Sequence, residues 1–74
     1  MPIVFSDHAK KQLKERYVSE KRIIEAVRDP NKVLSSFKNR RLRQRRFGDR
    51  ILEVVTVTEG SRITVVTVYY LKII

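Results

Sequence analysis

The chain has 74 residues and a formal net charge of +9, from 17 lysines and arginines against 8 acidic residues. This length allows one small domain, spanning residues 1–74, with a simple core. It contains no cysteine and one histidine, which excludes disulfides, thiolate metal sites and a zinc site built from histidines. We therefore expect neither a metal ion nor another cofactor.

The excess of positive charge predicts a polyanionic partner. Arginine outnumbers lysine, and its planar guanidinium binds phosphate through two hydrogen bonds, which favours RNA or DNA. An anionic membrane is the alternative, but the basic residues lie on a predicted strand rather than on a basic amphipathic helix. The N-terminal segment has no charged leader and no long apolar stretch, so we expect a cytoplasmic protein without a membrane span.

The first predicted element is a short helix that begins near Asp7 and ends near Tyr17. Ser6 is a typical capping residue, and the acidic side chain of Asp7 suits the positive end of the helix dipole. Ala9, Leu13 and Tyr17 then recur every four residues and form a narrow apolar stripe. We expect this stripe to face the core.

A second helix follows almost at once. Ser19 repeats the capping signal, and Asp29-Pro30 ends the helix because proline restricts the residue before it. Its buried side is expected to consist of Ile23, Ile24 and Val27.

After Pro30 the apolar period changes from about four to two, which indicates strands. Gly48-Asp49 is a two-residue turn with glycine where a type II′ turn requires it, and another turn follows at Glu59-Gly60, with or without Ser61. The fold class is therefore α+β, with two N-terminal helices packed on one face of a three- to four-stranded antiparallel meander. We expect strands at residues 32–36, 40–47, 50–58 and 62–71, the first of them weak.

The turn at Gly48-Asp49 fixes which side of the sheet each basic residue occupies. Arg41, Arg43 and Arg45 should share one side, and a two-residue second turn would add Thr67 and Tyr69 to it, whereas a three-residue turn would reverse that addition. We prefer the two-residue turn because it gathers an apolar face for the helices and leaves the arginine row open. That apolar face would hold Leu42, Val55, Val57, Val66 and Val68, with Arg40 and Arg46 at its edge.

Several side chains could support RNA cleavage without a metal, which needs a proton acceptor, cations and a proton donor. Histidine is the side chain whose ordinary pKa lies near neutrality, and His8 is followed by Gln12 and Arg16 on one helix face. Alternative interpretations without catalysis remain open. In these, His8 is an exposed residue with no role, the arginine row only binds phosphate, and Thr67 and Tyr69 are ordinary strand residues with high β-propensity. The predicted catalytic residues are His8, Arg43, Arg45 and Tyr69, and the predicted nucleic-acid contacts are Arg16, Lys38, Arg40, Arg41, Arg46 and Thr67.

The chain resembles a family of small prokaryotic domains grouped with RelE-like toxins in the barnase–EndoU–colicin–RelE superfamily of metal-independent ribonucleases. The resemblance covers nearly the whole chain and rests on S-D-H-A in the first helix, E-R at its end, the helix-ending D-P and the closing T-V-Y strand. It implies a RelE-like fold, endonucleolytic attack on RNA, often messenger RNA, and a cognate antitoxin that covers the basic face. The positions that match are His8, Arg16, Arg43, Arg45, Thr67 and Tyr69.

The leading hypothesis is therefore a RelE-like endoribonuclease toxin that cleaves RNA by attack of the 2′-hydroxyl on the adjacent phosphate. The free chain would be a monomer or a weak dimer. The alternative is a non-catalytic RNA- or DNA-binding module that uses the same basic face. A third hypothesis is a protein-interaction domain whose positive face binds an acidic partner.

Overall fold

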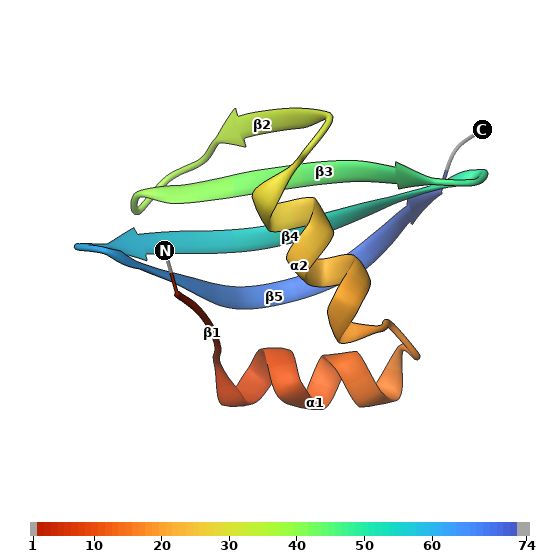
Figure 1. Ribbon diagram of the computed structural model, residues 1–74, viewed down its shortest axis with the longest axis horizontal. Helices are drawn as coiled ribbons and strands as arrows, with labels where there is room; N and C mark the ends of the chain where they lie inside the picture. The colour runs from red at the N-terminus through yellow and green to blue at the C-terminus, as the bar shows by residue number, and fades with distance from the viewer. Residues whose placement is uncertain (1, 73–74) are drawn as a thin grey trace.

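The computed structural model describes residues 2–72 and has an α+β architecture, with two helices and one five-stranded mixed sheet. The strand order across the sheet is β1-β5-β4-β3-β2 (Figure 1). Neither helix is long and apolar enough to cross a membrane. The elements are β1 (Ile3–Phe5), α1 (Asp7–Glu15), α2 (Glu20–Arg28), β2 (Lys32–Ser35), β3 (Arg40–Phe47), β4 (Arg50–Glu59) and β5 (Arg62–Lys72).

The N-terminal strand β1 corrects the predicted strand count and the prediction of a purely antiparallel sheet. It pairs in parallel with β5, with Ile3 opposite Ile63, while the other four strands form the expected antiparallel meander. The backbone N–H of Ile63 donates to Pro2 at 3.0 Å, and that of Ser6 donates to Val65 at 3.0 Å. These hydrogen bonds pair backbone groups of β5 that would otherwise lack a partner at the edge of the sheet.

Helix α1 begins as predicted but ends two residues early. The Ser6 hydroxyl accepts from the backbone N–H of Ala9 at 3.1 Å and caps the first turn. Tyr17 lies beyond the helix with a left-handed φ of 52° and is 93% exposed, so its predicted place in the core is wrong. The left-handed residue turns the chain. Val18 then fills the core and donates to the Leu13 carbonyl at 3.1 Å.

Helix α2 covers one face of the sheet, whereas α1 runs along the edge formed by β5 (Figure 1). The Ser19 hydroxyl caps α2 by accepting from the backbone N–H of Arg22 at 3.1 Å. Ile23, Ala26 and Val27 are buried against β3 and β4. One broad face of the sheet therefore lacks a helix, and we call it the open face.

A β-bulge decides which residues of β5 lie on the open face. The second turn has two residues, with Glu59 opposite Arg62, but Val55 pairs with Thr67 while Thr56 pairs with Val65. Val66 is therefore an extra residue, and it reverses the side of every later residue of β5. The register of β3 with β4 agrees with prediction, and Gly48 has a φ of 66° in the turn.

Helix α2 covers the opposite face from the one predicted, and α1 lies at the β5 edge rather than on the same face as α2. The bulge brings Val68 level with Val54, and both join a core that includes Leu52 and Val65 at 0% exposure. The other face carries Glu53 among its valines. The open face carries Lys32 and Leu34 of β2, Arg40, Leu42, Gln44 and Arg46 of β3, Ile51, Glu53, Val55 and Val57 of β4, and Thr67, Tyr69 and Leu71 of β5.

Candidate functional site

The centre of the open face is the carboxylate of Glu53, on the middle strand of the sheet. The residue is only 5% exposed. Its cross-strand neighbours are Gln44 on β3 and Tyr69 on β5. The amide of Gln44 donates to Glu53 Oε1 at 3.0 Å. Because burying a carboxylate is costly unless it accepts hydrogen bonds, these neighbours stabilise Glu53 in its position.

The second partner of Glu53 is the hydroxyl of Tyr69. Its hydrogen bond to Glu53, its burial and the charge of Glu53 raise the pKa of Tyr69 to about 12, against a smaller opposing effect of Arg16. Tyr69 is therefore neutral near pH 7 and holds a proton that it can pass to the carboxylate. A phenol paired with a buried carboxylate is a suitable group for proton transfer.

Four polar side chains cross the open face in one line, and we call Lys32, Gln44, Glu53 and Tyr69 the polar row. Each lies opposite the next on adjacent strands. On one side of the row lie Leu34, Leu42, Val55 and Thr67, and on the other lie Arg46, Ile51 and Leu71. A mostly apolar surface therefore surrounds a hydrogen-bonded centre, with cations toward its periphery.

Helix α1 places a cation at the Tyr69 end of the polar row. Arg16 Nη1 donates to the Val68 carbonyl at 3.0 Å, and the charge of Arg16 acts on the Tyr69 hydroxyl. Gln12 accepts from the Val68 backbone N–H at 3.0 Å and also from the Thr67 hydroxyl. These bonds pair the backbone N–H and carbonyl of Val68, in the part of β5 that β1 does not cover. They also hold Arg16 beside Tyr69. The remaining nitrogens of Arg16 can bind a ligand.

The structure separates His8 from this group. His8 is exposed and lies about two turns before Arg16, or about 12 Å along the helix axis. The two residues share a helix side, as predicted from their spacing. One phosphate bound by Arg16 beside Tyr69 would therefore lie at the other end of α1 from His8.

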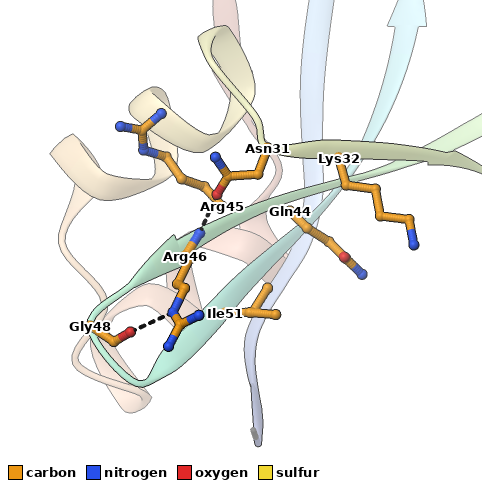
Figure 2. A pocket seen from close by; sticks show the side chains of 7 residues that line it. All are labelled: Asn31, Lys32, Gln44, Arg45, Arg46, Gly48 and Ile51. Carbon is orange, nitrogen blue, oxygen red and sulfur yellow. Dashed lines mark hydrogen bonds between the residues drawn. The ribbon is translucent and has the colours of Figure 1, made fainter.

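The prediction that Arg43 and Arg45 line an open face is wrong. Arg43 Nε donates to the Thr56 hydroxyl and its Nη1 donates to the Val27 carbonyl, both at 3.0 Å. Arg45 Nη1 donates to the Asp29 carbonyl and, at 3.0 Å, to its carboxylate. Figure 2 shows Arg45 directed toward the helices, opposite to Lys32 and Gln44.

These two arginines stabilise the C-terminal end of α2. The last carbonyls of a helix lack partners within it, and the helix dipole favours a cation there. Burial and, second, the charge of Arg41 lower the pKa of Arg43 below its usual value. The role of the pair is therefore to fix α2 on the sheet.

The other residues predicted to contact nucleic acid lie in three different parts of the structure. Arg40 and Arg46 lie on the open face and not, as predicted, on the helix-covered side. Thr67 is also on the open face, whereas Arg41 is exposed on the other side of the sheet. Lys38 is exposed in the turn before β3, where its φ is 58°.

Sequence reasoning missed Glu53 as a site residue. The available signal was a single acid inside the apolar central strand, residues 51–57. Within residues 2–72, no group of three or more histidine, cysteine, aspartate or glutamate side chains is arranged to hold a metal ion. The candidate site therefore consists of the polar row and Arg16.

Comparison with known proteins places the chain in a described family. A family model described as a domain of unknown function matches residues 5–70, a segment that contains the whole polar row and Arg16. No significant match was found among curated proteins or among solved structures.

Proposed function

We propose that this chain, which belongs to the DUF4258 family, is a RelE-like endoribonuclease toxin that cleaves RNA without a metal ion. The observation that carries the proposal is the buried Glu53 carboxylate, hydrogen-bonded to a neutral Tyr69 with Arg16 beside it, on a face that no helix covers. Two helices and an antiparallel meander also agree with the RelE-like fold that the sequence resemblance implies. A cytoplasmic location belongs to the same proposal.

The proposed reaction begins at the ribose 2′-hydroxyl. Tyr69 accepts its proton and at the same time passes its own proton to Glu53. The 2′-oxygen bonds to the adjacent phosphorus, and the bond from phosphorus to the 5′-oxygen breaks. The 5′-oxygen takes a proton from water, and Glu53 releases its proton to solvent through Tyr69. The products are a 2′,3′-cyclic phosphate and a 5′-hydroxyl.

In this mechanism Tyr69 and Arg16 contact the substrate, and Glu53 acts through Tyr69. Negative charge develops on the phosphate oxygens, and a cation fixed in advance stabilises it best. Arg16 meets this condition because its bond to the Val68 carbonyl holds the guanidinium in place. Gln44 positions the carboxylate from the other side.

The cations around the polar row would bind the RNA backbone. Lys32, Arg40 and Arg46 lie on the open face, and Lys38 lies in the turn before Arg40. Phosphate contacts of this kind supply affinity without reading sequence. Messenger RNA is the proposed substrate, and a cognate antitoxin is the proposed protein partner of this face.

The proposal is tested by RNA cleavage in EDTA. We expect the wild type to cut RNA, and Glu53→Gln and Tyr69→Phe to cut it about 100-fold more slowly, the usual loss when proton transfer is removed. Arg41→Ala is the matched control, because Arg41 is exposed on the same basic strand but on the other side of the sheet. A wild-type protein that binds RNA but never cuts it would instead be a non-catalytic binding module.

A further inference from the structure

We infer that a shallow cavity beside the polar row binds one nucleotide of the RNA strand, next to the bond that is cut. The inference rests on the proposed function and adds a substrate subsite to it. Figure 2 shows the cavity, between the start of β2 and the turn that joins β3 to β4. Its lining residues are Asn31, Lys32, Gln44, Arg45, Arg46, Gly48 and Ile51. We call this cavity the nucleotide subsite.

Arg46 is held in a fixed position at the nucleotide subsite. Its Nε donates to the Gly48 carbonyl at 2.8 Å, and its backbone N–H donates to Asn31 Oδ1 at 2.7 Å. These bonds leave the two terminal nitrogens of the guanidinium for a ligand. Among the described residues, Arg46 has no salt-bridge partner. Two terminal N–H groups side by side match two oxygens of one phosphate.

Lys32 supplies a second cation to the same cavity. It lies opposite Gln44, so it is a diagonal neighbour of Arg46 on the adjacent strand, at a backbone separation of about 7 Å. Lys32 also forms no salt bridge within residues 2–72. Figure 2 shows the Lys32 ammonium and the Arg46 guanidinium on opposite sides of the cavity, with Gln44 and Ile51 between them. The phosphate of the nucleotide is therefore placed at Arg46, and Lys32 adds positive charge on the other side of the cavity.

The floor of the nucleotide subsite suits a base. Ile51 lies opposite Arg46 and is half-buried, so it offers an apolar surface of limited area. The Gln44 amide uses one N–H on Glu53, and its carbonyl oxygen and second N–H remain for the edge of a base. Gln44 therefore contacts both the subsite and the Glu53 carboxylate. A base is accessible in this way only in single-stranded RNA.

The test is a titration of the ¹⁵N-labelled protein with uridine 3′-monophosphate and, separately, with inorganic phosphate, followed by NMR. We expect the backbone signals of Lys32, Arg46 and Ile51 to shift, and the nucleotide to bind more tightly than phosphate. Arg46→Ala should weaken nucleotide binding about tenfold, as expected for losing a hydrogen bond to a charged group. Arg41→Ala, on the other side of the same strand, should bind the nucleotide as the wild type does.

RNA cleavage separates this inference from the proposed function. Arg46→Ala should raise KM about tenfold and leave kcat close to the wild-type value, because the subsite binds the strand and transfers no proton. Cleavage with an unchanged KM in Arg46→Ala, or nucleotide-induced shifts elsewhere on the protein, would overturn the subsite. If the nucleotide binds at the subsite and no RNA is cut, the subsite is supported while the proposed endoribonuclease fails.

Discussion

At the scale of single residues, the most informative group is the pair of Glu53 and Tyr69. Burying a glutamate on a central strand costs free energy unless its carboxylate is hydrogen-bonded, whereas a valine there would pack without such partners. The structure satisfies it with Gln44 on one side and Tyr69 on the other. The same hydrogen bond that stabilises the carboxylate keeps Tyr69 protonated. One interaction therefore serves both the fold and the proposed chemistry.

The raised pKa of Tyr69 predicts a loss of stability at high pH. An unfolded tyrosine releases its proton near pH 10, but Tyr69 in the fold releases it near pH 12. Between these values the unfolded state binds fewer protons, so the free energy of unfolding falls as pH rises, and the full contribution is present below pH 10. Urea unfolding at pH 9 and pH 11 should show a larger loss for the wild type than for Tyr69→Phe. Equal losses would contradict the Glu53–Tyr69 hydrogen bond.

Arg16 and His8 give opposite predictions although both lie on α1. Arg16→Ala should lower kcat about 100-fold, because it removes the cation beside Tyr69. His8→Ala should keep a rate close to that of the wild type, since His8 lies about two turns away. Single-turnover cleavage of RNA by folded protein measures both. A large loss in His8→Ala alone would restore histidine as the catalytic base or acid and remove Tyr69 from that role.

At the scale of elements, side chains alternate along the basic strand β3, and this alternation divides its arginines between the two sides of the sheet. Its odd-numbered arginines 43 and 45 reach under α2 and bind that helix at its C-terminal end. Its even-numbered positions 40, 44 and 46 face the open side. Two of the five arginines of β3 therefore stabilise the packing of α2, and two others, Arg40 and Arg46, are available to a ligand on the open face.

Arg43→Ala should destabilise the fold by roughly 1.5–3 kcal/mol, the range for a hydrogen bond that involves a charged group. Thr56 and the Val27 carbonyl would each lose a partner. Arg43→Lys should not restore the loss, because an ammonium cannot bond in two fixed directions. Urea unfolding measures the stability, and RNA binding by the folded variant should match the wild type. Unchanged stability with weaker RNA binding would assign Arg43 to the ligand instead.

Most elements could be predicted from local sequence signals, and two features could not. The helix caps at Ser6 and Ser19 and the turn at Gly48 are single-residue signals with a direct physical cause. Strand β1 has only three residues, too few to show a period. The bulge at Val66 lies in a run of β-branched residues where any member could be the extra one.

The extra residue Val66 explains why the prediction placed Tyr69 on the wrong side of the sheet. Without a bulge, Tyr69 would share a side with Arg43 and Arg45. With it, Tyr69 lies opposite Glu53 on the other side, and Val68 enters the core. The residues of the candidate site were therefore partly predictable by type, since Arg16 and Tyr69 belong to the predicted set. Their grouping around Glu53 depended on a register that only the folded sheet defines.

At the scale of the whole molecule, the net charge of +9 should appear as a steep salt dependence of RNA binding. Five contacts, from Arg16, Lys32, Lys38, Arg40 and Arg46, give a slope of about −3.5 for the logarithm of the association constant against that of salt concentration. Arg46→Ala should flatten the slope by about 0.7, the effect of one phosphate on single-stranded RNA. Fluorescence anisotropy over a salt series measures both, with Arg41→Ala as the control. A flat response would remove nucleic acid as the partner of this face.

The most direct test of cleavage at the Glu53–Tyr69 pair is the chemistry of the product ends. RNA and DNA oligonucleotides of one sequence are incubated with the protein in EDTA, and the ends are identified by mass spectrometry. We predict 2′,3′-cyclic phosphate and 5′-hydroxyl ends from RNA, no cleavage of DNA, and loss of the products in Tyr69→Phe. Ends with a 5′-phosphate, or equal cleavage of DNA, would contradict attack by the 2′-hydroxyl at this site.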